Sequence, residues 1–130
     1  MLIIGIGHDL VEIARIGRIL QGNTKESFIR RILAEEEIAR APSGDRRLAE
    51  YAAGRFAAKE AVAKALGCGI GAAVCFTDII VLPDRHGKPV CTLSDRAWER
   101  LGLDASETVI HVTITHERAM ASAFAVVERR

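Results

Sequence analysis

The chain has 130 residues, 49% of them hydrophobic and 27% charged, and its formal net charge at pH 7 is +1. This length and hydrophobic content suit one folded domain over residues 1–130 and exclude a disordered chain. The small net charge excludes a global attraction to nucleic acid or to an anionic membrane. The three cysteines show no CxxC spacing, and the apolar N-terminal stretch is too short to span a bilayer and lacks the flanks of a signal peptide. We therefore expect a cytoplasmic protein.

The first half of the chain is predicted to be mostly helical. Residues 2–7 form a short apolar run broken by glycines, which predicts a buried strand, and helical periodicity begins at Asp9. Asp9 followed by Glu12 matches a capping box at the start of that helix. One or two further helices are expected over 24–39, and after a loop a long alanine-rich helix is expected from Arg46 to Leu66.

The second half is predicted to be rich in sheet. Two strand-like runs, 75–82 and 89–93, flank the turn PDRHGK and predict a β-hairpin, and Ser94 is expected to cap a short helix. The alternating segment 108–115 is followed by 119–128, which favours a strand over a helix and completes a second hairpin. Helices early and hairpins late predict a single-domain α+β fold, with the long helix packed on antiparallel hairpins.

The long helix carries charged residues on a background of alanine. Such a helix lets neighbouring backbone approach closely, so Lys59, Glu60 and Lys64 are expected to reach water or to line a cleft shared with a charged group. The Glu60–Lys64 pair at i,i+4 also supports the helix itself. Spacing alone favours that local role.

Asp9 allows two interpretations. It can cap the helix that follows it, or it can be a functional group presented at the end of a buried strand. In the functional interpretation, Asp9 and Glu60 converge as ligands of Mg²⁺, which prefers one or two protein carboxylates together with waters and phosphate oxygens. Their separation in sequence carries no metal-ligand spacing, so the residues alone leave both interpretations open.

Gly67, Gly69 and Gly71 close the long helix. They could present backbone N–H groups to a phosphate, although ending the helix explains them as well. The chain lacks the GK[ST] element of a P-loop and the third glycine of a dinucleotide fingerprint. Cys68 could act as a nucleophile only with a depressed pKa, and His116 at the end of a strand would be free to act or merely solvated.

Four stretches of the chain together resemble one enzyme family. The pairing of GIG-x-D with RFAAKEA-x-x-KA-x-G is specific to 4′-phosphopantetheinyl transferases, and the chain is similar in size to their short single-unit subtype, the holo-[acyl-carrier-protein] synthases. The resemblance runs from end to end, and the order and separation of the stretches agree with the family. The four stretches are GIGHDLVEIARI, GRFAAKEAVAKALGCGIG, FTDIIVLPDRHGKP and VTITHERAMASAFAVVE.

This resemblance implies a catalytic set. Phosphopantetheine would pass from coenzyme A to a serine hydroxyl of apo acyl carrier protein, for fatty acid biosynthesis, with release of adenosine 3′,5′-bisphosphate. Asp9 and Glu60 would hold Mg²⁺ against the coenzyme A diphosphate, in place of the capping role. Lys59 and Lys64 would lie beside the diphosphate. The serine proton would go to Glu60 or to a metal-bound water, between which the sequence does not choose.

Family positions also imply residues that bind coenzyme A. Arg47 is a candidate for the 3′-phosphate and His116 for the phosphate region. Cys68 departs from the threonine common in relatives, so a hydroxyl contact to phosphate would be lost. The full implied set is Arg47, Lys59, Lys64, Gly67, Cys68, Gly69, Ile70 and His116.

Two kinds of partner follow from the resemblance. Arg15 and Arg18 lie off an apolar helical stripe and fit a docking face for the acidic carrier protein, although a solvated helix face is the ordinary alternative. Family members are homotrimers with the site between neighbouring subunits, so one chain alone would be inactive.

Two other classes of function compete with this one. A non-catalytic module that binds coenzyme A or a carrier protein would keep Arg47 and the glycine turn but need not keep Asp9, Glu60 and Lys64 together. A structural oligomer would use the alanine-rich helix only for packing, and it predicts no affinity for coenzyme A. The retention of both acids and Lys64 argues against the binding module.

Overall fold

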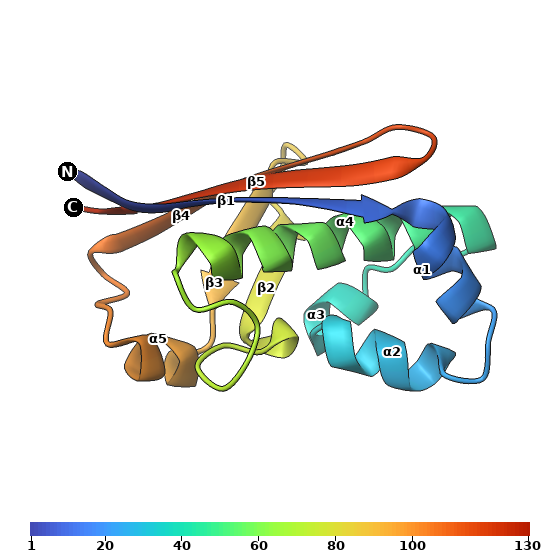
Figure 1. Cartoon of the computed structure of the whole chain (residues 1–130), viewed down its shortest axis with the longest axis horizontal. Coiled ribbons are helices and arrows are strands. Elements are labelled where there is room, and N and C mark those ends of the chain that lie inside the picture. The colour runs from blue at the N-terminus through green and yellow to red at the C-terminus, as the bar shows by residue number, and fades with distance from the viewer.

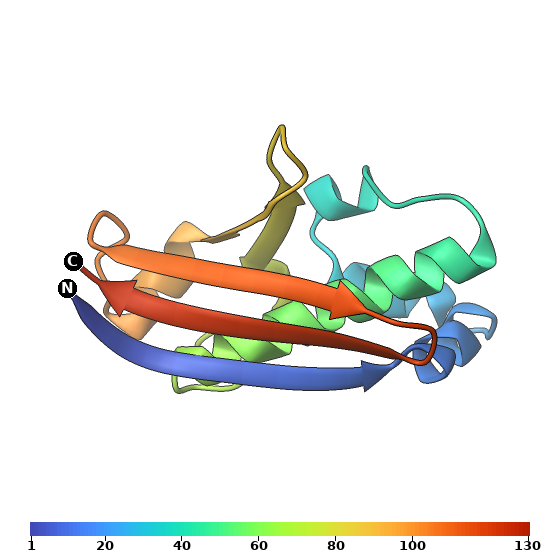
Figure 2. The ribbon, with the colours of Figure 1, turned by 90° about the horizontal axis from the view of Figure 1, so that it is seen from above.

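In the computed structural model, which describes residues 1–130, one long helix lies across one face of an antiparallel sheet (Figure 1). The helix is α4 (Asp45–Ala65), and the sheet has the strand order β1-β5-β4. Figure 2 shows the three strands side by side above α4. The strands are β1 (Leu2–Glu12), β5 (Met120–Arg129) and β4 (Thr108–His116).

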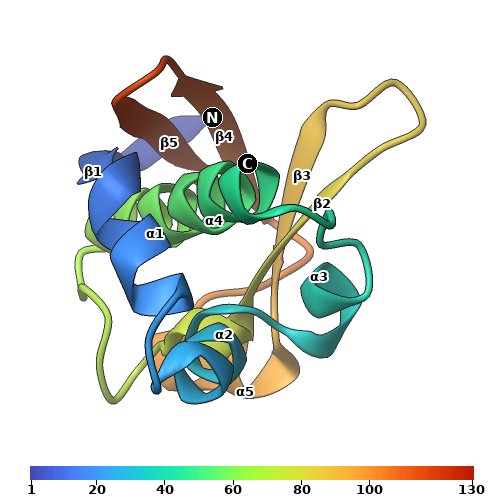
Figure 3. The same ribbon diagram turned by 90° about the vertical axis from the view of Figure 1, so that its right-hand side faces the viewer.

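The remaining elements cover the other side of α4. A two-stranded antiparallel ribbon, β2–β3, stands beside the helix, as the end-on view in Figure 3 shows. Helices α1, α2 and α3 gather near the start of α4, and α5 lies near its end (Figure 1). Their bounds are α1 (Ile13–Leu20), α2 (Lys25–Ile32), α3 (Glu35–Ile38), the 3₁₀ turn η1 (Phe76–Asp78), β2 (Ile79–Pro83), β3 (Pro89–Leu93) and α5 (Asp95–Leu101).

Small residues set the short distance between α4 and the sheet. Alanines on both elements are fully or almost fully buried where they meet. The closest approach is at β1, where a Cβ added at Gly5 would collide with the carbonyl oxygen of Ala65 and one added at Gly7 with that of Ala61. These glycines therefore let the strand lie directly on the helix backbone, which explains why the chain has glycine there without a dinucleotide motif.

Most predicted elements are confirmed. The α+β fold, the long helix and both hairpins are present, and the segment after His116 is a strand. Ser94 caps α5, since its hydroxyl accepts a hydrogen bond from the Ala97 N–H at 3.3 Å. No helix has the length and apolar character needed to cross a bilayer.

Two predictions for the N-terminal segment are wrong. The strand over residues 2–7 is not buried, since Leu2, Ile3 and Ile6 are 53%, 58% and 64% exposed. The predicted start of the first helix is also wrong. Strand β1 continues to Glu12 because it stays paired with β5, with Asp9 opposite Ala123. Helix α1 begins only at Ile13, and Glu12 at its N-cap position makes no side-chain capping bond. The capping-box interpretation of Asp9 and Glu12 is therefore excluded: pairing with a distant strand overrides the local helical pattern.

Candidate active site

Asp9, Glu60 and Lys64 come together where β1 runs along the second half of α4. The Lys64 ammonium donates to Asp9 Oδ1 at 3.1 Å and to the carbonyl oxygen of His8 at 3.0 Å. Glu60 lies one turn before Lys64 on the same helix. Because β1 lies so close to α4, a residue of the N-terminal strand reaches side chains more than fifty positions later in the sequence.

The charge of Asp9 affects the protonation of Glu60. Burial raises the pKa of Glu60, the nearby charge of Asp9 raises it further, and Lys64 lowers it. The site thus holds two acids and one compensating ammonium group.

This donor set fits a hard divalent cation such as Mg²⁺, which takes oxygen ligands. Asp9 and Glu60 are the carboxylates that could hold it. Nowhere in the chain do three or more histidine, cysteine, aspartate or glutamate side chains lie close enough together to hold a metal ion. A cation bound here would therefore need further oxygen ligands from water or from a substrate.

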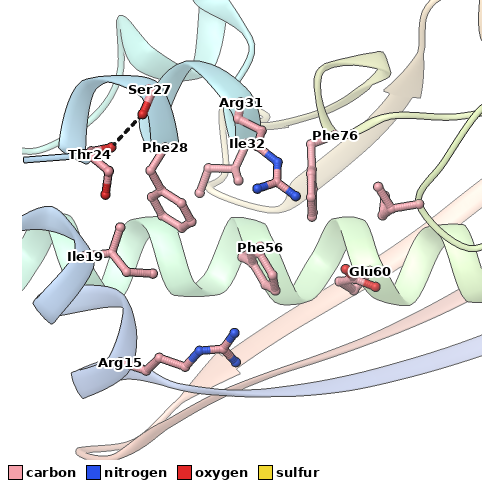
Figure 4. Close-up of a pocket in the computed structure, with 11 residues that line it drawn as sticks. Arg15, Ile19, Thr24, Ser27, Phe28, Arg31, Ile32, Phe56, Glu60 and Phe76 are labelled. Carbon is pink, nitrogen blue, oxygen red and sulfur yellow. Dashed lines mark hydrogen bonds between the residues drawn. The ribbon is translucent and has the colours of Figure 1, made fainter.

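A pocket of about 640 Å³ opens beside Glu60. Figure 4 shows Arg15 on α1 and Arg31 on α2 flanking α4 from two sides, with aromatic rings between them. The Phe56 ring packs on Phe76 at 5.1 Å between centroids. The pocket is thus apolar in its centre and cationic at two edges. Its lining is Arg15, Ile19, Thr24, Ser27, Phe28, Arg31, Ile32, Phe56, Glu60, Ile70 and Phe76.

The two arginines predicted to dock the carrier protein are in different surroundings. Arg15 lines the pocket beside Glu60, whereas Arg18 does not line it and contacts Glu12 at 3.5 Å on an exposed surface. Arg31 is a pocket residue that sequence reasoning missed, because its helical segment carried no motif that singled it out.

A second, smaller pocket of about 220 Å³ holds Arg47 and His116 near the start of α4. His116 Nδ1 lies 3.9 Å from Glu50 Oε2. Arg55 also lines this pocket: its guanidinium lies 4.4 Å from the Tyr51 ring centre, and its Nε is buried without a hydrogen-bond partner. Sequence reasoning missed Arg55, although its position inside the GRFAAKE motif was an available signal.

The predicted coenzyme A residues are thus divided between two places on one chain. Arg47 and Glu60 lie on the same helix, and thirteen residues at 1.5 Å each separate them by roughly 20 Å along its axis. The larger pocket contains neither Arg47 nor His116, and the smaller pocket does not contain Glu60. A single chain therefore does not bring Arg47 and His116 next to Asp9 and Glu60.

The prediction that Lys59 lies beside the diphosphate, or reaches water or a cleft, is wrong. Its side chain is fully buried and its ammonium donates to the Glu37 carboxylate and to the carbonyl oxygens of Ile32 and Phe76. Burial lowers the pKa of Lys59, and Glu37 opposes that shift. The physical reason is the helical rotation of about 100° per residue, which turns Lys59 away from the face that carries Glu60.

The glycine turn ends α4 and does not form an open anion-binding nest. The N–H of Gly67 donates to the Lys64 carbonyl, and those of Cys68 and Gly69 donate to the Ala63 carbonyl. Gly67 and Gly69 have φ of 82° and 65°, a conformation that glycine adopts without strain. Contact of this turn with coenzyme A stays a prediction.

Cys68 itself is not an activated nucleophile. Burial raises the pKa of its thiol, which disfavours the reactive thiolate at neutral pH. Of the remaining turn residues, Ile70 lines the larger pocket together with Glu60.

Comparisons with known sequences place this geometry in context. Residues 5–124 match the model of the 4′-phosphopantetheinyl transferase superfamily. A holo-[acyl-carrier-protein] synthase from Bacillus thuringiensis (strain Al Hakam) is 43% identical over 129 residues, covering 98% of this chain and 97% of the relative.

Solved structures agree with these sequence relationships. The holo-(acyl-carrier-protein) synthase of Bacillus anthracis, in complex with CoA (3′,5′-ADP), has a TM-score of 0.81 and 40% identity, with full coverage of both chains. The synthase of Neisseria meningitidis has a TM-score of 0.87 and 36% identity, covering 98% of this chain and 100% of the other. The Helicobacter pylori synthase in complex with coenzyme A has a TM-score of 0.81 and 32% identity, covering 95% and 99%.

Proposed function

The chain belongs to the 4′-phosphopantetheinyl transferase superfamily, as an enzyme of the holo-[acyl-carrier-protein] synthase type, and from this premise we propose the reaction that its residues perform. It transfers 4′-phosphopantetheine from coenzyme A to a serine hydroxyl of apo acyl carrier protein, in a Mg²⁺-dependent step that releases adenosine 3′,5′-bisphosphate. The product carrier serves fatty acid biosynthesis. The observation that carries the proposal is the meeting of Asp9 and Glu60 around Lys64.

Asp9, Glu60 and Lys64 form the proposed catalytic centre. Asp9 and Glu60 would hold Mg²⁺, which when bound would supply positive charge to the diphosphate and to the leaving group. Lys64 adds an ammonium group on a flexible stem, and about half of its side chain is exposed. Phosphoryl-type transfer gains mostly from positioning and charge neutralisation, so these three side chains match its needs.

Glu60 is the proposed acceptor of the serine proton within the chain. A general base works best when its pKa is near the working pH. Without a bound cation, burial and the charge of Asp9 raise the pKa of Glu60 and Lys64 lowers it, with a net upward shift. A water molecule near the same carboxylate is the alternative acceptor. Glu60 thus either receives the proton itself or orients the water that receives it.

The second pocket is proposed to bind the adenosine end of coenzyme A. Arg47 and Arg55 supply positive charge for the 3′-phosphate, and His116 supplies a further hydrogen-bonding group. Because this pocket is remote from Glu60 on the same chain, a neighbouring subunit is proposed to contribute it, in a homotrimer.

The outer face of the sheet supports this assembly. Ile6, Leu10 and Phe124 leave 64%, 57% and 49% of their surface exposed on β1 and β5. The His8 ring stacks on Phe124 at 4.1 Å between centroids and continues the same face. A contiguous apolar patch of this kind is typical of a protein–protein contact.

The carrier protein is proposed to dock at the larger pocket. Arg15 and Arg31 attract its acidic surface, and the aromatic centre of the pocket accepts apolar side chains or the pantetheine arm. This arrangement holds the carrier serine near Glu60.

Intact-mass measurement of apo acyl carrier protein tests the proposal. The carrier is incubated with the protein and coenzyme A, with Mg²⁺ or with excess chelator, and in parallel with Glu60→Ala. A gain of one phosphopantetheine that needs both Mg²⁺ and Glu60 supports the proposal. An unmodified carrier that a known synthase does modify would favour the non-catalytic binding module, whose signature is Mg²⁺-independent binding of coenzyme A.

A further inference from the structure

The Lys64 ammonium lies where it neutralises a proposed metal ligand. Both of its hydrogen-bond acceptors are on β1: Asp9 Oδ1 at 3.1 Å and the His8 carbonyl oxygen at 3.0 Å. The Asp9 side chain is only 18% exposed, whereas that of Lys64 is 49% exposed. Asp9 is therefore fixed by the strand, and Lys64 is the partner that is free to move.

We infer that Lys64 competes with the divalent cation for Asp9 until coenzyme A binds, so that cation and coenzyme A bind cooperatively. This inference rests on the proposed function and adds a control on the same site. In the free protein, Lys64 acts as an internal cation. When coenzyme A is present, its diphosphate offers Lys64 a second anionic partner, and Asp9 becomes available.

The charges of the site support the competition. With all three side chains ionised, Asp9, Glu60 and Lys64 together carry a formal charge of about −1, whereas the two carboxylates alone carry about −2. A divalent cation gains more from the second arrangement. The chain also offers no third acidic or imidazole ligand, so coenzyme A phosphate oxygens are natural additional ligands.

The Lys64–Asp9 contact is also easily exchanged. A half-exposed ion pair contributes little net free energy, because water screens it and the long side chain loses entropy when held. Lysine has a flexible four-carbon stem and a compact charge, so it reaches new partners without a backbone change. By linkage, coenzyme A that draws Lys64 away strengthens cation binding, and the cation strengthens coenzyme A binding by the same factor.

Binding of Mn²⁺, used as a spectroscopic substitute for Mg²⁺, tests the inference without measuring turnover. Free and bound Mn²⁺ are quantified by electron paramagnetic resonance for the unaltered protein and for Lys64→Met, with and without coenzyme A. Lys88→Met removes an equal charge from the exposed β2–β3 turn and is the matched control. Asp9→Asn identifies the signal as coming from this site.

Without coenzyme A, we expect Lys64→Met to bind Mn²⁺ roughly two- to fivefold more tightly than the unaltered protein, the range of one partly exposed ion pair. Coenzyme A should strengthen Mn²⁺ binding clearly in the unaltered protein and less in Lys64→Met. Lys88→Met should behave as the unaltered protein does.

Equal or weaker Mn²⁺ binding by Lys64→Met in the absence of coenzyme A would overturn the inference and leave the proposed metal site intact. A different outcome, no Mn²⁺ binding by the unaltered protein even with coenzyme A, would overturn the proposed metal site and this inference with it. Retention of Mn²⁺ binding by Asp9→Asn at full affinity would also overturn both.

Discussion

Two faces of helix α4 give lysine opposite environments. Lys59 and Lys64 are five residues apart, which turns their side chains about 140° away from each other around the helix. Lys59 is buried among α2, α3 and η1, where its ammonium donates hydrogen bonds to Glu37 and to two carbonyl oxygens. Lys64 is half exposed and contacts a strand edge beside two carboxylates.

The difference indicates a structural role for one lysine of the helix and supports a proposed chemical role for the other. A buried ammonium with all its donors used has no capacity left for a ligand, so Lys59 stabilises the domain. An exposed ammonium with exchangeable partners can follow a substrate, which supports the proposed place of Lys64 in the catalytic centre. The following four experiments test this separation.

The largest expected effect is on stability, from Lys59→Met. This change leaves the Glu37 carboxylate buried without its cation, although the N–H groups of Ala34 and Val81 still donate to it. Breaking such a pair typically costs about 3–5 kcal/mol. Urea unfolding measures the loss, and the double variant with Glu37→Gln should recover part of it. A free energy of unfolding within about 1 kcal/mol of the original would show that the stability of the domain does not depend on the Lys59–Glu37 pair.

On the face of α4 that carries Lys64, Glu60→Gln should remove activity and preserve the fold. The amide cannot accept the serine proton or hold a cation well, so the transfer rate should fall at least about a hundredfold. The measurement is the rate of carrier modification by mass, with thermal unfolding as a check on folding. Glu99→Gln, at an exposed position of α5, is the matched control and should keep full activity. A Glu60→Gln rate near the original would remove Glu60 from the catalytic centre.

Gly7→Ala tests the close contact between β1 and α4 that brings Asp9 to Lys64. The added Cβ meets the Ala61 carbonyl oxygen, a backbone atom that yields only if β1 moves away from α4. We expect a loss of about 1–3 kcal/mol in thermal unfolding, as for an overpacked core. Gly71→Ala, where an added Cβ meets open space, should change stability little. Equal stability of the two variants would show that close contact of β1 with α4 is not required.

The smallest effect is expected for the arginines of α1. Arg15→Glu should weaken carrier-protein binding by about fivefold or more, roughly 1 kcal/mol, and should reduce its salt dependence. Arg18→Glu should have less effect, because Arg18 lies outside the pocket. Titration of the carrier at two salt concentrations compares the two, and coenzyme A binding should remain near normal. Equal losses would mean that docking depends on the whole α1 surface.

Local sequence patterns were sufficient to predict most of the secondary structure. Periodicity over several turns predicts α4, and alternation predicts the two hairpins, because each pattern is written within one segment. The same information failed at β1. The residues after Asp9 have a helical period, and pairing with β5, over a hundred positions later, keeps them in the strand.

The candidate site divides in a similar way. Asp9 and Glu60 were found through motifs, since their residue types and order are visible in the chain. The burial of Lys59 was not visible, because its partner Glu37 lies 22 positions away with no spacing rule to link them. Arg55 and Arg31 were missed because a residue's place in a pocket depends on which elements surround it.

By itself, the sequence determined the order of helices and strands and the identity of the acids and bases available for chemistry. Only the tertiary structure decided which of those charges meet. Gly5 and Gly7 let β1 approach α4, and that contact brings Asp9 to Lys64 while the helical rotation hides Lys59. The physical reason is that charge–charge contacts depend on distances between packed segments, and packing joins residues that are far apart in the chain.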